Sequence, residues 1–341
     1  MRAAFVTCGG FDDLTGAGVY DRRLAGHLRE RGDTVDVVSL PRRCYARSLG
    51  EGLSGGLAGT LAGGRYDAII EDEQDHPSLL LLNRRLRRRA EGPIVAIVHR
   101  LRCRGRCPGA ARLIFRRIEK LYLDSTDGIV CDSEIAHRAA GTQRPGRPAV
   151  RDRRAGGGRA ADLRVLFVGN VIRRKGLHVL VDALASLPPV GWRLDVVGSL
   201  AADSRYAAAV RRQIAERGIG ERICFRGVVG DGLLARILDD GHVLVVPSIE
   251  EGSGMVSIEA FSRALPVIAS RAGGAAEVVS HGRDGFLVDP GDAAMIASYL
   301  ELLMENRGYL RKVSTAAGVS AARFPTWAES AEAVSSFIRS L

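Results

Sequence analysis

Short runs of β-branched and other apolar residues alternate with longer polar or amphipathic stretches along the whole chain. Because this alternation is typical of parallel strands joined by crossover helices, each half predicts a doubly wound α/β lobe. The strands predicted in the first half are Ala3–Thr7, Val35–Ser39, Asp67–Ile70, Ile94–Val98 and Gly128–Cys131. Those predicted in the second half are Arg164–Val168, Leu194–Val197, Ile223–Phe225, Val243–Val246 and Val267–Ala269.

A segment without apolar periodicity separates the two halves. Residues 142–162 hold prolines, a triple glycine and several arginines, which is the composition of a linker. After Pro325, apolar residues at helical spacing predict an amphipathic closing helix that packs back towards the first half. The predicted domains are a first Rossmann-like lobe (1–145), a linker (146–162), a second Rossmann-like lobe (163–322) and the closing segment (323–341).

Composition agrees with a folded globule that has two cores. A length of 341 residues exceeds what one hydrophobic core usually supports, and 46% hydrophobic with 26% charged residues excludes global disorder. No apolar run approaches the roughly 18 to 20 residues that span a bilayer, and the first residues lack the apolar core of a signal peptide. The six scattered cysteines suit reduced thiols, so we expect a cytoplasmic protein.

One spacing of possible metal ligands occurs, at His99, Cys103 and Cys107. The neighbouring arginines would add positive charge around a cation, and Gly105 and Pro108 interrupt a helix. The sequence therefore predicts neither a metal ion nor another resident cofactor.

The formal net charge of +10 lies almost entirely in the first half. Residues 1–162 contain 29 basic and 20 acidic residues, which leaves a charge of +1 for the remainder. The arginines at 84–89 and the amphipathic segment Ala111–Leu123 suit anionic lipid, at the inner face of a membrane, or a phosphorylated acceptor. The favoured interpretation is a solvated helix face, with Ile114, Ile118 and Leu121 turned towards the core.

The segment 243–279 carries the sharpest chemical signal. A buried strand ends at Pro247, a glycine-bearing loop follows, and a helix is predicted over Met255–Ala264. Unpaired amides at a helix start and the helix dipole favour a diphosphate, and Gly252 and Gly254 let the main chain approach its oxygens.

Two carboxylates, Glu251 and Glu259, flank the start of this helix. Carboxylates accept hydrogen bonds from vicinal hydroxyls, so one would take the hexose and the other the ribose of a nucleotide sugar. Taken alone, the pair is better explained as a helix-start charge and a solvated helix face.

A second strand ends in a Gly169–Asn170 turn and is followed by Arg173, Arg174 and Lys175, before a helix that begins near Gly176. Three cations at a helix start, where the dipole disfavours them, indicate a bound anion. Only three of the 49 basic residues are lysines, so the lysine here points to a requirement for a compact ammonium group.

Three motifs of the second half are specific: G-N-x-x-R-R-K-G at Gly169–Gly176, P-S-x-x-E-G-x-G-M-V-x-x-E-A at Pro247–Ala260, and P-V-I-A-S-x-x-G-G at Pro266–Gly274. They resemble the family 4 retaining glycosyltransferases of the GT-B fold, in which two Rossmann-like doubly wound lobes face each other across a cleft. The T-G-A-G-V-Y run at Thr15–Tyr20 and the terminal helix after Pro325 add weaker similarity, so that the resemblance covers nearly the whole chain.

The resemblance implies transfer of a hexose from a nucleoside diphosphate sugar, UDP- or GDP-linked, with retention and without a metal. The acceptor would be a small molecule, a glycan or a lipid-linked sugar; no nucleic acid is expected, since aromatic residues are only 5% of the chain. The implied catalytic residues are His99, Glu251 and Lys175. The implied donor-binding residues are Gly16, Gly169, Asn170, Arg174, Lys175, Glu251, Gly252, Ser253, Gly254, Met255, Val256 and Glu259.

Some positions depart from the family pattern. Asn170 stands where a phosphate-binding arginine is frequent, so Arg173 or Arg174 would supply that charge. Ser253 stands where an aromatic residue is usual. From position alone, His99 at the end of an apolar strand is better explained as structural. The acids Asp12, Asp13 and Asp21 fit cleft residues and ordinary loop or helix-cap acids equally well, so none is assigned to the site.

Two other classes of function fit parts of the sequence. One is a basic polyanion- or membrane-binding protein with a vestigial nucleotide site, which would bind DNA or anionic vesicles but no nucleotide sugar. The other is a GT-B epimerase or phosphorylase acting on similar ligands, which would form no new glycoside. Residues 1–140 hold no motif that identifies the acceptor.

Overall fold

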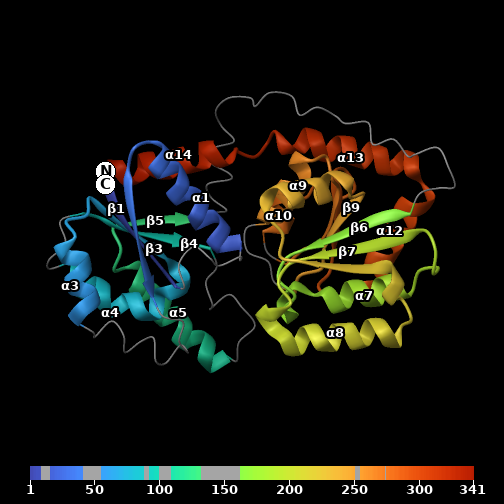
Figure 1. Ribbon diagram of the computed structural model, residues 1–341, viewed down its shortest axis with the longest axis horizontal. Coiled ribbons are helices and arrows are strands. Elements are labelled where there is room, and N and C mark those ends of the chain that lie inside the picture. The colour runs from blue at the N-terminus through green and yellow to red at the C-terminus, as the bar shows by residue number, and fades with distance from the viewer. Residues whose placement is uncertain are drawn as a thin grey trace. The chain divides into compact units, whose positions relative to one another are not determined.

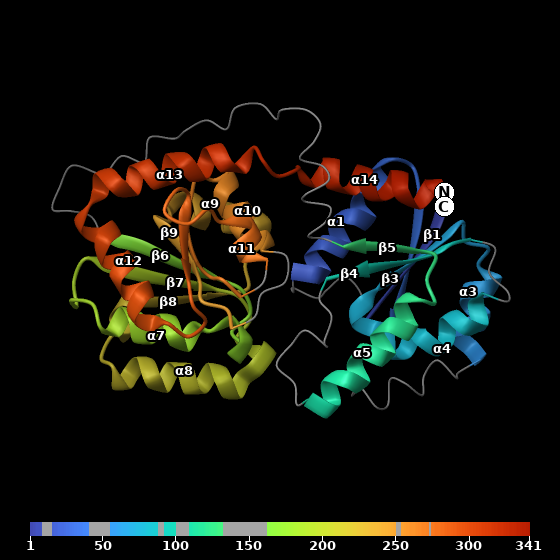
Figure 2. The ribbon, with the colours of Figure 1, turned by 180° about the vertical axis from the view of Figure 1, so that it is seen from behind.

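The computed structural model describes residues 1–8, 16–40, 55–87, 92–99, 109–131, 162–249, 254–272 and 274–341. The chain divides into two compact units (Figures 1 and 2). Unit 1 comprises Met1–Thr142 together with Pro325–Leu341, and unit 2 comprises Gln143–Phe324. Across the described part of the chain, no helix is both long and apolar enough to cross a bilayer.

Unit 1 is built on a five-stranded sheet in which every pairing is parallel. The strand order is β2-β1-β3-β4-β5. The strands are β1 (Arg2–Cys8), β2 (Thr34–Leu40), β3 (Ala68–Asp72), β4 (Ile94–Val98) and β5 (Gly128–Cys131). The chain enters the sheet at the interior strand β1 and adds strands on both sides of it, which is the doubly wound topology expected from the sequence.

Helices cover both faces of this sheet. They are α1 (Gly16–Glu30), α3 (Gly55–Gly63), α4 (His76–Leu86), α5 (Gly109–Leu123) and α14 (Trp327–Ser340), with a short 3-10 turn η2 (Glu73–Asp75) after β3. Figures 1 and 2 show α1 and α14 on one face and α3, α4 and α5 on the other. The core of the second face packs Leu79 and Leu82 of α4 and Tyr122 of α5 against Val6 of β1.

Unit 2 has a six-stranded parallel sheet in the order β11-β10-β9-β6-β7-β8. The strands are β6 (Leu163–Val168), β7 (Trp192–Val197), β8 (Ile223–Gly227), β9 (Val243–Val246), β10 (Val267–Ser270) and β11 (Gly285–Val288). The α-helices are α7 (Leu177–Ala185), α8 (Ser204–Glu216), α9 (Asp231–Asp240), α10 (Met255–Ser262), α11 (Ala275–Val278), α12 (Ala293–Glu305) and α13 (Arg307–Ala321). The 3-10 turns are η4 (Arg173–Lys175), η5 (Ala201–Asp203) and η6 (Gly220–Arg222).

Alternate residues of a central strand supply the two cores of unit 2. Val165 and Phe167 of β6 pack with α7, α8 and α12, whereas Leu166 between them packs with α9 and α10. Because both faces of the sheet are covered, the central strands β9 and β10 are buried at every position, and their short apolar runs are visible in the sequence. The strand that sequence reasoning missed is β11, whose four residues open with Gly285 at the sheet edge.

The favoured interpretation of α5 is wrong in part. Ile118 is partly buried, but Ile114 and Leu121 are 58% and 38% exposed. The side of α5 that faces the core is set instead by Glu119 and the fully buried Tyr122. The helix therefore turns apolar side chains outward together with its arginines.

Candidate functional site

The site in unit 2 lies where the direction of sheet growth changes. Strand β6 neighbours β7 on one side and β9 on the other, so the loops that leave the carboxyl ends of β6 and β9 diverge. In open α/β sheets, ligands bind at such a switch point. The loop after β6 carries Gly169–Gly176, and the loop after β9 begins at Pro247. The two most specific motifs therefore lie together at the carboxyl ends of these two neighbouring strands.

The two loops are joined by backbone contacts. The N–H of Ile249 donates to the carbonyl of Arg174 at 2.8 Å. Gly176 has φ +73°, and a Cβ placed there would lie 2.1 Å from the carbonyl oxygen of Pro247. Only glycine permits this backbone conformation together with this approach.

The turn after β6 is packed as closely. A Cβ at Gly198 would lie 2.1 Å from the carbonyl oxygen of Gly169, so the turns after β6 and β7 touch through their main chains. Asn170 fastens them, because its side-chain Oδ1 accepts a hydrogen bond from the Ser199 N–H at 3.2 Å. Asn170, which stands where an arginine is frequent in the family, thus stabilises the backbone of the loop. Its contact with the donor stays a prediction.

Lys175 ends the turn η4, directly before α7. Its aliphatic stem runs past Gly169, since a Cβ at Gly169 would lie 3.5 Å from Lys175 Cε. Arg174 and Lys175 are half-buried, whereas Arg173 is exposed. Of the two arginines proposed to replace the family arginine, Arg174 is therefore the more enclosed.

Among the described residues, the start of α10 has no side-chain cap. Gly254 is the N-cap residue, with φ +72°, and its carbonyl accepts from the Ser257 N–H at 2.9 Å. Met255 and Val256, the first residues of the helix, are half-buried. A helix start that lacks a capping side chain keeps backbone donors and a partial positive charge for an anion.

Not every predicted donor residue can be placed. Glu259 lies one turn after Met255 on α10 and is half-buried. Glu251, Gly252 and Ser253 lie outside the described residues, as do Asp12, Asp13, Cys103 and Cys107. Gly16 is the first residue of α1 in unit 1.

His99 follows β4 directly in unit 1, and its ring is held by Asp21 of α1. Because a carboxylate only accepts hydrogen bonds, His99 Nε2–H donates to Asp21 Oδ1, at 3.1 Å. The two side chains are 6% and 1% exposed. Tyr20 packs edge-on against the imidazole, with ring centroids 5.3 Å apart. Asp21, which fitted a cleft residue and a helix-cap acid equally well from the sequence, is thus the hydrogen-bond partner of His99.

Two acids at the carboxyl end of β3, Asp72 and Glu73, lie close to the same histidine. The His99 backbone N–H donates to Glu73 Oε2 at 3.2 Å. Ligand atoms of Asp21, Asp72 and His99 lie within 4.8 Å of one another, as do those of Glu73, His76 and Glu119. Each group is close enough for its ligand atoms to share one metal ion, and the sequence signal was the acidic run E-D-E-Q-D-H at the carboxyl end of a parallel strand.

A protonated carboxyl lies behind this cluster. Glu71 is completely buried, and burial raises its pKa to about 8, although the hydrogen bond from Asn83 Nδ2 at 3.0 Å opposes that rise. Within the described part of the chain, Glu71 Oε1 has no hydrogen-bond partner. The carboxyl is therefore mostly neutral at pH 7.

Comparisons with known proteins match the second half most strongly. The model of the family described as glycosyl transferases group 1 matches residues 151–318. A D-inositol 3-phosphate glycosyltransferase of Pseudarthrobacter chlorophenolicus is 32% identical over 161 residues, which is 46% of this chain and 38% of that protein. A phosphatidyl-myo-inositol mannosyltransferase of Mycobacterium leprae is 29% identical over 96% of this chain and 93% of its own length.

Solved structures show a similar fold over the full length. HepE of Anabaena in complex with UDP-glucose has a TM-score of 0.75 at 20% identity and covers 100% of both chains. Sucrose-phosphate synthase of Thermosynechococcus elongatus has a TM-score of 0.74 at 21% identity, covering 100% of this chain and 98% of that one. The two parallel sheets flanked by helices are the GT-B fold that the sequence predicts.

Proposed function

Because the chain belongs to the glycosyl transferases group 1 family, we propose that it transfers a hexose from a nucleoside diphosphate sugar to an acceptor. One observation supports this most directly. The loop that carries Lys175 and the uncapped start of α10 follow neighbouring strands at the switch point of unit 2. An ammonium group and helix-start amides together suit a diphosphate.

The chemistry follows from the charge that develops as the sugar leaves. The bond from the anomeric carbon to the diphosphate oxygen breaks, and negative charge grows on that oxygen. The Lys175 ammonium and the amides of Met255 and Val256 stabilise this charge. Glu259 holds the ribose and Glu251 the transferred sugar. Transfer with retention of configuration belongs to this proposal because the family resemblance implies it. Independence of a metal ion belongs to it because a fixed ammonium group and backbone dipoles supply the required positive potential.

Within unit 1, the family resemblance supports His99 as a catalytic residue. Asp21 does not act on the substrate in this proposal; it holds the imidazole in one orientation and one tautomer. Asp21 is therefore a positioning residue.

The names of similar proteins guide the choice of substrates. HepE was solved with UDP and with UDP-glucose, which supports a UDP-sugar as the first donor to test. Two relatives are named for inositol 3-phosphate and phosphatidyl-myo-inositol. These names support a sugar or lipid-linked acceptor. Peripheral contact with a membrane from the cytoplasmic side is part of our proposal for a lipid-linked acceptor.

The test is a donor screen with the full chain. UDP-, GDP- and ADP-sugars are compared by thermal protection and by slow hydrolysis of the donor without acceptor. We expect at least one donor to raise the melting temperature and to be hydrolysed. No response to any of them, together with salt-sensitive binding to DNA, would favour the polyanion-binding alternative. Products analysed after addition of acceptor separate a transferase, which forms a new glycoside, from an epimerase or phosphorylase.

A further inference from the structure

The side chains described in the first half of α5 are only partly buried or exposed. From Ala111 to Ile118 no side chain is buried, and Leu113 and Ile114 are 67% and 58% exposed. Burial begins only at Glu119 and Tyr122. Figure 2 shows the N-terminal end of α5 extending beyond α4 and the sheet. A helix end that buries so little of its own apolar surface gains little stability from packing.

The exposed apolar side chains share one side of the helix. At 100° per residue, Leu113 and Leu121 lie on the side opposite Glu119 and Tyr122, and Ile114 borders them. Leu121 is 38% exposed, so the apolar row continues towards the packed end of the helix. Three large apolar residues on one exposed face form a patch, which is more than the scattered single residues normal for a surface.

The charge on this face is uniformly positive. Its exposed ionisable residues are Arg116, Arg117 and Lys120. The acid of the helix, Glu119, is 2% exposed and faces inward. The exposed face of α5 therefore presents three cations among three apolar side chains.

We propose that α5 docks on a bilayer that contains anionic phospholipid. Leu113 and Ile114 would enter the boundary between head groups and acyl chains, while the long arginine and lysine side chains extend to the lipid phosphates. A second copy of the chain is a poor occupant, because it would set three cations against three cations. Anionic lipid satisfies both the apolar and the charged part of the face.

This contact deepens the proposed function and rests on it in one respect. A lipid-linked acceptor would be held close to unit 1, which carries His99. Binding to lipid itself needs no donor and no turnover. The two proposals can therefore fail separately.

The test is co-sedimentation of the full chain with vesicles of phosphatidylcholine alone and with about one third phosphatidylglycerol. We expect binding to be at least about tenfold stronger with the anionic vesicles and to weaken in high salt. The variant carrying Leu113→Asp and Ile114→Asp, and a second carrying Arg116→Glu and Arg117→Glu, should each bind at least about tenfold more weakly. Val190→Asp and Arg212→Glu introduce the same charges at exposed positions of unit 2 and should bind like the wild type.

An independent readout does not depend on disruptive substitutions. Leu113→Trp should show a blue-shifted fluorescence maximum with anionic vesicles only. Equal binding to both kinds of vesicle, wild-type binding by both α5 variants, or an unshifted tryptophan would overturn the proposal. A dimer in solution that the α5 variants abolish, without vesicle binding, would assign this face to a second copy instead. Donor hydrolysis in solution should persist in the α5 variants; its absence in every protein, with vesicle binding intact, would reject the proposed function alone.

Discussion

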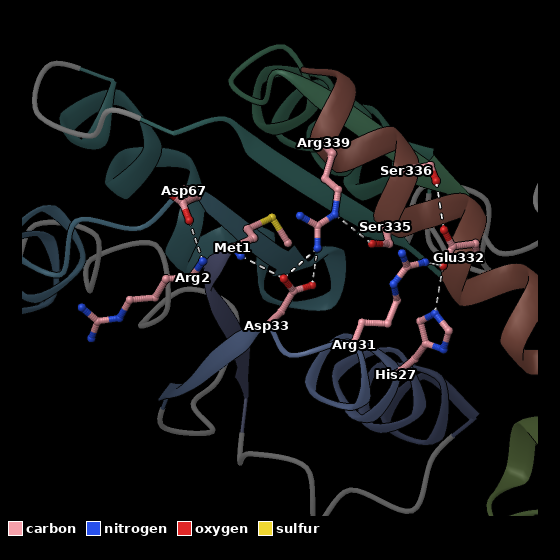
Figure 3. Close-up of polar contacts among 10 residues, drawn as sticks. All are labelled: Met1, Arg2, His27, Arg31, Asp33, Asp67, Glu332, Ser335, Ser336 and Arg339. Atoms are coloured by element: carbon pink, nitrogen blue, oxygen red, sulfur yellow. Dashed lines mark hydrogen bonds and ion pairs between the residues drawn. The ribbon is translucent and has the colours of Figure 1, made fainter.

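Arg339, near the end of α14, donates two hydrogen bonds to the carboxylate of Asp33, at 2.7 and 2.6 Å. The Asp33 side chain is 4% exposed and also accepts from the α-ammonium group of Met1 at 2.9 Å. Figure 3 shows these contacts beside a second group, in which Glu332 of α14 is hydrogen-bonded to both His27 and Arg31. The last helix of the chain is thus fastened to the beginning of the chain by a buried carboxylate.

We expect Arg339→Met to lower the free energy of unfolding by about 1–2 kcal/mol, because a buried carboxylate loses one of its two cationic partners. The arginine is 43% exposed, so the loss should stay below that for a fully buried pair. Urea denaturation of the full chain measures the change. Arg193→Met removes a similar contact to Asp162, with side chains 70% and 31% exposed, and should cost less than about 0.5 kcal/mol. Equal costs would contradict the prediction.

The stability that the Asp33–Arg339 contact contributes should depend on pH in the acid range. Burial alone would raise the pKa of Asp33, but hydrogen bonds from the N-terminal ammonium and Arg339 outweigh it and hold that pKa below 3.8. A lowered pKa in the folded state contributes stability above pH 3.8, which is lost as the pH falls through the folded value. Acid unfolding should therefore begin at a higher pH in Arg339→Met than in the wild type. Coincident acid-unfolding curves of the two proteins would show that the contact does not contribute to stability at acid pH.

Sequence patterns located most of the strands but few of the polar pairs. Buried parallel strands are short apolar runs, so their positions are local information. Asp33 and Arg339 are 306 residues apart, and Asp21 and His99 are 78 apart, so their pairing depends on the order of strands and helices in space. For the same reason the outward face of α5 was misjudged. Helical periodicity shows that a face is apolar, but not whether anything covers it.

Glu71 should destabilise unit 1 at alkaline pH. Its folded pKa of about 8 lies above its ordinary value of 4.5, so its contribution to stability is full below pH 4.5 and is lost as the pH rises through about 8. Glu71→Gln keeps an oxygen for the Asn83 amide but carries no charge. We expect the variant to be more stable than the wild type by on the order of 2 kcal/mol at about pH 9, and no more stable at about pH 4. Thermal melting across this range measures the difference; parallel curves would refute a buried neutral carboxyl.

Asp21→Asn should reduce turnover more than donor binding. The amide can present either its oxygen or its NH2 group to His99, so the imidazole is no longer held in one tautomer. We expect kcat to fall about tenfold or more, KM for the donor to change less than about twofold, and the pH profile of kcat to move. Asp36→Asn changes an exposed partner of Arg2 and serves as the matched control. A purely structural role would instead lower the melting temperature and leave the pH profile unmoved.

Gly176→Ala should separate the two loops of the donor site. Gly176 and Gly218 share a left-handed backbone, with φ +73° and +67°, but a Cβ at Gly218 would meet nothing within 4 Å. Both alanine variants pay the conformational strain, about 1 kcal/mol, and only Gly176→Ala also collides with the carbonyl of Pro247. Donor protection against melting should be lost in Gly176→Ala and kept in Gly218→Ala. Loss in both, or in neither, would show that the close approach of the loops is not required.

Lys175 tests the leaving-group chemistry itself. Lys175→Ala should stay folded, since the residue is only half-buried, and lose at least about a hundredfold in donor-dependent turnover, because the departing diphosphate loses an ammonium partner. Lys175→Arg keeps the charge but not its compact shape beside Gly169, so we expect partial activity. Lys312→Ala, on α13, removes the same group from an exposed position and should be neutral.

The role of Lys175 can be tested further with donors whose leaving group is easier to expel. Donors whose diphosphate is replaced by an activated leaving group, such as a fluoride or a nitrophenyl group, need less electrostatic help in the transition state. Lys175→Ala should therefore recover a larger share of wild-type turnover with such donors than with the natural one. An equal deficit with both kinds of donor would mean that Lys175 serves binding alone, which single-turnover kinetics at saturating donor would confirm.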